Sequence, residues 1–168
     1  MDQMSLYFQA TVTRVWAPRG QTPTLRISPQ RDHRHFYGAL NVLTGHEIAR
    51  TFAEQSSVTT VQFLNELLIC YPNRPLLLLW DRAPWHKGAV VRDFLQTHPL
   101  IQTLHFPPAC PQLNPQEHVW ERTRDAISHN HTQTTFSALV HAFHRHLETT
   151  TFSFNWIERF APPPLCGF

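Results

Sequence analysis

Strand-like and helix-like patterns of apolar residues alternate along the chain and predict a mixed α/β fold. Residues 76–80, "LLLLW", are apolar at every position, which is typical of a strand buried on both faces. Residues 59–70 and 88–98 instead repeat apolar side chains at helical spacing. The same reasoning predicts further strands over 5–16 (one or two), 36–43, 46–52 and 100–106, and helices over 115–127 and 136–148.

The order of these elements narrows the fold class. Strands come first and are followed by helix, strand, helix, strand and helix, so we expect a mixed sheet flanked by helices. We expect a single domain over residues 1–150 and a C-terminal tail over 151–168. The tail sequence "APPPLCGF" excludes regular structure, because consecutive prolines lack amide donors and fix φ.

Composition excludes several classes of protein. Of the 168 residues, 42% are hydrophobic, which argues against a disordered chain. The net charge of +2 does not by itself indicate a nucleic-acid-binding protein. The three cysteines are odd in number and widely spaced, which favours a reducing cytosol over a disulfide framework. No apolar run approaches the roughly 20 residues that span a bilayer, so no membrane association is expected.

Asp81 is the first candidate for chemistry, because it follows directly after the most hydrophobic strand. Ligands of such sheets collect at the carboxyl ends of the strands. The alternative is structural, since an aspartate at this position can also cap a turn or the following helix.

Glu117 and Asp2 are two further candidates, and each has a structural alternative. Asn114 and Pro115 suit the N-cap and first position of a helix, so Glu117 could close a capping box without any catalytic role. Asp2, taken alone, could be a solvated terminal residue. The connection from Asp81 to Glu117 holds one helix, one strand and one loop, which can return a carboxylate to the strand end. Together the three carboxylates would form an all-oxygen site for Mg²⁺ or Mn²⁺. Two such ions would clamp the attacking and leaving oxygens of a phosphoryl displacement.

Two sequence blocks carry a family resemblance. "LLLLWDRAPWHKGAVVRDFL" and "LHFPPACPQLNPQEHVWERTRDAI" resemble the catalytic core of DDE transposases, in particular the mariner-related branch of bacterial insertion sequences. Upstream, "RVWAPRGQTP" resembles the segment that follows the first aspartate of that family. The resemblance implies a ribonuclease-H-like fold, two Mg²⁺ or Mn²⁺ ions, and DNA cleavage and strand transfer. It assigns Asp2, Asp81 and Glu117 as the catalytic and metal-binding residues, with Gln3 in place of the usual glutamate.

The chain departs from that family at two places. Arg82 stands where the family commonly has asparagine, and its guanidinium either disfavours cations or contacts phosphate. Only Met1 precedes Asp2, so we expect the first strand to be largely missing, together with the region that recognises element ends. We interpret the chain as a truncated copy, or as the second reading frame of a frameshifted element.

The expected partners follow from the resemblance. They are DNA, as element ends and target, and a second copy or an upstream-frame chain in the bacterial cytosol. The residues that we expect to contact DNA flank the two carboxylates, and they are Arg82, His86, Lys87, Arg122 and Arg124. His86 and Lys87 could instead orient the site or lie in a solvated loop. Two alternatives stay open for the whole chain. It could be a ribonuclease-H-like nuclease that does not join strands, or an inactive remnant that only binds DNA or a partner.

Overall fold

A computed structural model of the chain describes residues 1–25, 29–108, 110–153, 155 and 156. Over these residues the fold contains five strands and four α-helices. The strands are β1 (Asp2–Tyr7), β2 (His33–Leu40), β3 (Glu47–Phe52), β4 (Leu76–Trp80) and β5 (Ile101–His105). The helices are α1 (Ser57–Cys70), α2 (Ala89–Thr97), α3 (Pro115–Thr123) and α4 (Phe136–Thr149). Short 3₁₀ turns η1 (Pro84–His86) and η2 (Pro111–Leu113) precede α2 and α3, and a π-helical turn η3 (Arg124–Ser128) follows α3.

The strands run in mixed directions, as the sequence predicted. β1, β2 and β3 form an antiparallel sheet in which Asp2 lies opposite Gly38, whereas β4 and β5 pair in parallel. The two sheets meet where the amino group of Met1 donates a hydrogen bond of 2.8 Å to the Leu79 carbonyl. β1 therefore lies beside β4, and Asp2 and Asp81 come from neighbouring strands.

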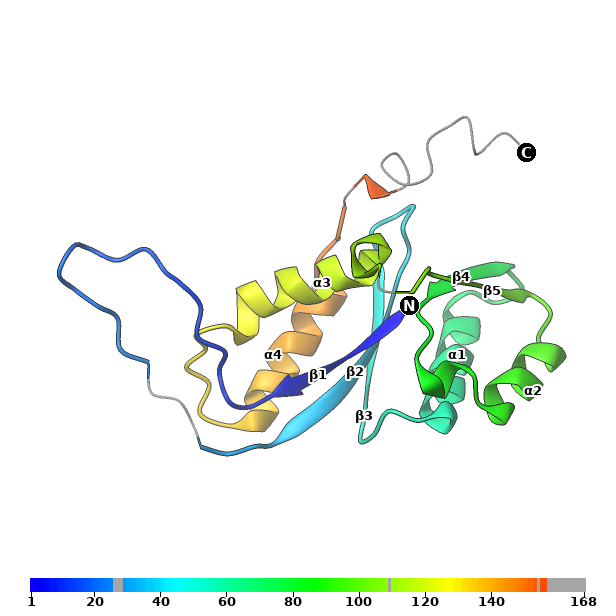
Figure 1. Cartoon of the computed structure of the whole chain (residues 1–168), viewed down its shortest axis with the longest axis horizontal. Helices are drawn as coiled ribbons and strands as arrows, with labels where there is room; N and C mark the ends of the chain where they lie inside the picture. The colour runs from blue at the N-terminus through cyan, green and yellow to red at the C-terminus, as the bar shows by residue number, and fades with distance from the viewer. Residues whose placement is uncertain (26–28, 109, 154, 157–168) are drawn as a thin grey trace.

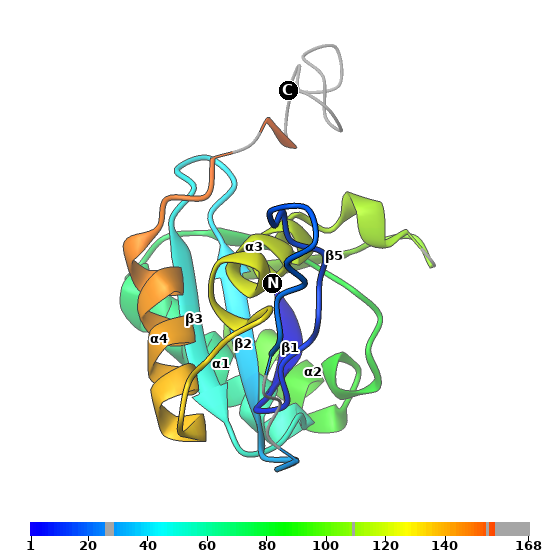
Figure 2. The ribbon, with the colours of Figure 1, turned by 90° about the vertical axis from the view of Figure 1, so that its left-hand side faces the viewer.

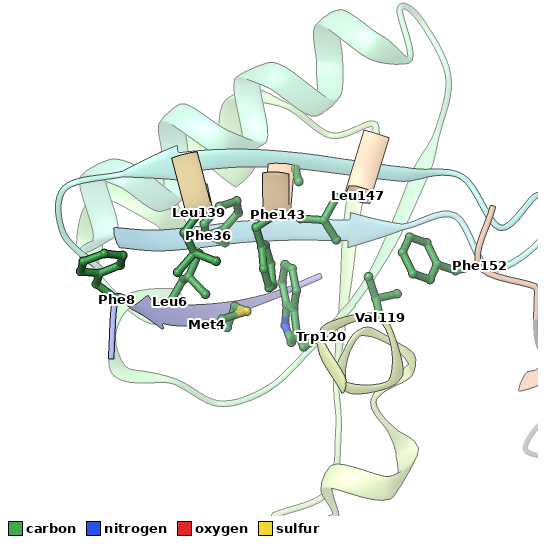
Figure 3. Packing of buried hydrophobic residues seen from close by; sticks show 11 residues of the cluster. Met4, Leu6, Phe8, Phe36, Val119, Trp120, Leu139, Phe143, Leu147 and Phe152 are labelled. Carbon is green, nitrogen blue, oxygen red and sulfur yellow. The ribbon is translucent and has the colours of Figure 1, made fainter. Parts of the chain in front are cut away.

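Helices cover both faces of the strands (Figures 1 and 2). α3 and α4 pack on one face of β1 and β2, where Trp120 and Phe143 meet Phe36 and Met4 (Figure 3). α1 and α2 cover the other face, where Tyr37 and neighbours form a second buried cluster with residues of α1, β4 and α2: Phe63, Leu64, Leu67, Leu78, Trp80 and Val91. This arrangement confirms the predicted α/β fold and places the start of α3 near the start of β1.

Two expectations about the elements need correction. The first strand, expected to be largely missing, is present over six residues, but it ends at Tyr7 rather than continuing to residue 16. The strand "LLLLW" is not buried on both faces, because α1 and α2 cover only one of them and 63% of Leu77 is exposed. Phe152, which falls in the expected tail over 151–168, is buried in the α3–α4 core. The "APPPLCGF" segment lies outside the described residues.

Candidate active site

The loop after β4 fixes the Asp81 carboxylate in a defined orientation. Its Oδ1 accepts a hydrogen bond of 3.0 Å from the Ala83 amide and lies 2.9 Å from Nδ1 of His86. The hydrogen bond from His86 is the main cause that lowers the pKa of Asp81 below its usual value; the Ala83 amide lowers it further, and burial opposes both. The side chain is still 49% exposed, so a held and ionised carboxylate faces solvent at the end of the strand. Asp81 does cap the turn, as the structural alternative held, because it accepts a hydrogen bond from the Ala83 amide. The same hydrogen bond orients the Asp81 carboxylate.

Three stacked aromatic rings, those of Trp80, His86 and His105, lie next to Asp81. The His86 ring is fully buried and lies parallel to Trp80, with ring centroids 4.5 Å apart. His105 stacks near Trp80 as well, and its Nδ1 donates to the Asp81 carbonyl at 3.0 Å. A buried ring cannot reach a DNA phosphate, so the structure does not support the expected DNA contact of His86. Its position fits the other alternative, a residue that orients the site.

Asp2 lies at the start of β1, where its carboxylate is buried against α3. Its Oδ2 accepts hydrogen bonds from Asn114 Nδ2 at 3.1 Å and from Trp120 Nε1 at 3.3 Å. The pKa of Asp2 is raised to about 6, chiefly by burial. The charges of Glu117 and Asp81 contribute to the rise, while the Gln3 amide and the Met1 amino group oppose it. The solvated-terminus alternative is therefore wrong, because only 7% of Asp2 is exposed.

Glu117 lies in the first turn of α3 and is exposed to solvent. The hydrogen bonds from Asn114 and Trp120 to Asp2 lie beside it. Asn114 is the N-cap, its side chain accepting from the Gln116 amide, and Pro115 is the first helical residue. The Asn114 amide donates to the Pro111 carbonyl at 2.9 Å, so Glu117 does not close the capping box that the sequence allowed. Glu117 is exposed while its neighbours Pro115 and Gln116 are buried.

The Asp2 carboxylate lies within range of the charges of the other two candidates, but the three groups form no closed cluster. The charges of Glu117 and Asp81 both raise the pKa of Asp2. Within the described part of the chain, no three His, Cys, Asp or Glu side chains are gathered closely enough to hold a metal ion as they stand. The donor set is nevertheless suited to a hard divalent cation, which would relieve the mutual repulsion of these oxygens.

Sequence reasoning missed two buried polar residues beside the site, Glu47 and Gln116. Nε2 of Gln116 donates to Oε1 of Glu47 at 2.7 Å, and its Oε1 accepts from the Leu40 amide at 2.9 Å. Burial raises the pKa of Glu47 to about 8, so the carboxyl is largely neutral at pH 7. The one signal in the sequence was Gly38, because a glycine inside a strand often marks a close approach of other groups.

Only glycine fits at position 38, because neighbouring side chains approach the backbone closely there. Substitution of Gly38 should therefore destabilise the fold. A Cβ at this position would overlap Glu47 Oε1, Trp120 Cη2 and Gln116 Nε2. We expect Gly38→Ala to lower the free energy of unfolding by about 1–3 kcal/mol, the usual cost of overpacking, or by more. Urea denaturation measures the change. Gly20→Ala is the control, because nothing lies within 4 Å of that Cβ and only its positive φ opposes the change. A Gly38→Ala protein no less stable than wild type would contradict the expectation.

The predicted DNA-contacting cations lie at different places around the carboxylates. Arg82 and Lys87 are exposed beside Asp81, and Nε of Arg82 donates to the Phe106 carbonyl at 3.3 Å. Arg124 is half-buried at the end of α3. Arg122 lies near His146 of α4, whose pKa is lowered chiefly by burial and also by this guanidinium. Arg122 lies roughly 140° around α3 from Glu117, so the two side chains leave the helix in different directions.

Comparison with known proteins assigns the family. Residues 1–140 match the family model described as DDE superfamily endonuclease. The chain belongs to this family. This DDE endonuclease domain is 22% identical over 151 residues to the insertion element IS630 uncharacterized 39 kDa protein of Shigella sonnei, a match that covers 89% of the chain and 44% of that relative.

Solved structures confirm the ribonuclease-H-like fold of the DDE endonuclease domain. It superposes on the Mos1 transposase paired-end complex with the left transposon end with a TM-score of 0.72 at 17% identity, covering 97% of this chain and 51% of that one. It also matches the catalytic domain of Mos1 mariner transposase, with a TM-score of 0.59 at 16% identity, over 79% of this chain and 70% of that one. The domain thus spans about half the length of the IS630 protein and of the Mos1 transposase chain in the paired-end complex. None of its described helices is long and apolar enough to cross a membrane.

Proposed function

We propose that this domain cuts DNA strands and transfers them to new sites, as the catalytic part of an insertion-sequence transposase. The observation that carries the proposal is the convergence on Asp2. α3 binds the Asp2 carboxylate directly, and the charges of Asp81 and Glu117 both act on it. The family is one of endonucleases, and the fold is shared with a transposase in complex with a transposon end.

Two divalent ions, Mg²⁺ or Mn²⁺, are part of the proposal. Asp2, Asp81 and Glu117 would hold them, and the neighbouring solved structures include Mos1 paired-end complexes with Mg and with Mn. When bound, such ions generate a nucleophile at neutral pH and stabilise the attacking and leaving oxygens of an in-line displacement. Because the pKa of Asp2 is raised to about 6, uptake of the ions near pH 6 would displace the proton from the fraction of Asp2 that carries one.

The residues of the domain would prepare these ligands in different ways. His86 and the Ala83 amide keep Asp81 ionised and limit its rotation. Asn114 and Trp120 fix Oδ2 of Asp2, while the first turn of α3 holds Glu117 at the edge of solvent, where substrate can enter. Arg82, Lys87 and Arg124 would neutralise phosphates of the bound DNA. The proposal includes a homodimer that acts on two DNA ends in the bacterial nucleoid.

A plasmid-nicking assay tests the proposal. We expect the purified chain to convert supercoiled DNA to nicked circles in Mn²⁺, and to stop when EDTA removes the metal. The bound ions should also raise the thermal unfolding temperature, because they bind the native state alone. Joining of a labelled oligonucleotide with a free 3′ end to plasmid separates a transposase from a nuclease that only hydrolyses. DNA binding without nicking in Mn²⁺ or Mg²⁺ would instead identify an inactive, DNA-binding domain.

A further inference from the structure

Gln116 connects α3 to two strands of the sheet at once. Its amide oxygen accepts from the Leu40 backbone of β2, and its amide nitrogen donates to the Glu47 side chain at the start of β3. The side chain is completely buried, so neither contact can be exchanged with water. Since Gln116 directly precedes Glu117, these two bonds act on the same helical turn that carries the proposed metal ligand.

Glu47 is built into the structure as a buried acceptor for this contact. Only 3% of the residue is exposed, and its Oε2 has no hydrogen-bond partner among the described residues. Burial accordingly favours the neutral carboxyl. Gly38 makes room for it, because any larger residue would strike both Glu47 and Gln116. A glycine, a glutamine and a buried glutamic acid from three elements thus meet in one contact.

We propose that Glu47 is a positioning residue, which through Gln116 sets the rotation and height of α3 and thereby the place of Glu117 relative to Asp2 and Asp81. Asn114 and Trp120 fasten the same helix to Asp2, but both contact a residue that is itself a proposed ligand. The Glu47–Gln116 contact includes none of the proposed ligands and fastens the helix to β3, at the opposite edge of the three-stranded sheet from β1. The effect on the metal site rests on the proposed function, whereas the effect on α3 does not.

Two substitutions of Glu47 separate positioning from general packing. Glu47→Gln keeps an oxygen that accepts from Gln116, whereas Glu47→Leu keeps the volume and removes the acceptor. Gln116→Met removes the contact from the other side, in case Glu47→Leu does not fold. Glu54→Leu is the matched control, because Glu54 is exposed just beyond the other end of β3. Each protein is examined by hydrogen exchange of the α3 amides, by Mn²⁺ binding in calorimetry, and by plasmid nicking.

The expected pattern differs among the variants. Glu47→Leu and Gln116→Met should increase exchange in α3, weaken Mn²⁺ binding and slow nicking by about tenfold or more, since small misplacements of a reacting group are costly. Glu47→Gln and Glu54→Leu should stay close to wild type in all three measurements. Unchanged exchange and Mn²⁺ binding in both Glu47→Leu and Gln116→Met would overturn the proposal, and so would equal losses in Glu47→Gln and Glu47→Leu. If wild type does not nick DNA, the proposed function fails, and exchange in α3 still decides the role of Glu47.

Discussion

Asp81→Asn should lose Mn²⁺-dependent nicking by about a thousandfold or more, the scale seen when one charged or hydrogen-bonding group of a catalytic site is removed. The asparagine has nearly the same shape and can still accept from the Ala83 amide, so the turn should persist. It lacks the negative charge that would bind the ions and that His86 now stabilises. Glu117→Gln should cause a similar loss, because it removes the charge of a proposed metal ligand. The helix should persist, since Glu117 is exposed and does not close a capping box.

Stability measurements and matched controls make this result specific. Both variants should unfold in urea within about 1 kcal/mol of wild type, as is usual for groups that are partly or largely exposed. Glu121→Gln, one turn further along α3 and with a side chain 73% exposed, should nick normally. Asp93→Asn on the exposed face of α2 is the control for Asp81. Normal nicking by Asp81→Asn or Glu117→Gln would remove that residue from the proposed metal site.

Glu47→Gln should remove much of the pH dependence of stability between pH 5.5 and 7.5. The pKa of Glu47 is about 8 in the folded protein against an ordinary value of 4.5, so the folded state retains a proton that the unfolded state releases. Stability from this group is therefore greatest at acid pH and is lost as the pH rises toward 8. The slope is about 1.4 kcal/mol per pH unit, so the wild type should lose about 2 kcal/mol relative to the variant over this interval.

Urea denaturation at several pH values measures the difference between the two proteins. Asp2, with a raised pKa of about 6, shifts stability in the same direction. His35 and His146, with pKa values lowered chiefly by burial, shift it in the opposite direction. These groups occur in both proteins and largely cancel, although Asp2 and the Met1 amino group also act on Glu47. Parallel stability curves for wild type and Glu47→Gln would show that Glu47 is ionised in the folded state.

Local pattern was sufficient to predict most of the elements and to nominate the acidic residues, but not to predict the contacts that hold them. The apolar run before Asp81 and the cap formed by Asn114 and Pro115 are properties of short segments, so β4 and the start of α3 could be predicted. The burial of Glu47 depends on Gln116, 69 residues further along the chain. Likewise, nothing in an apolar pentapeptide says that Leu77 lies on an uncovered face. Such features arise from tertiary packing, and composition or spacing does not reveal them.

The two hydrogen bonds that Asp2 accepts from α3 give its carboxylate a structural role in addition to the proposed role as a metal ligand. Removing it would strand the Asn114 amide and the Trp120 indole N–H in a dry interior, where unpaired donors are expensive. Replacing Asp2 with a residue that lacks an acceptor oxygen would therefore remove the proposed metal ligand and loosen the scaffold together, whereas asparagine would keep an acceptor for both donors. A copy that drifts toward inactivity has more freedom to change at Asp81 or Glu117, and an intact Asp2 alone is poor proof of a working enzyme.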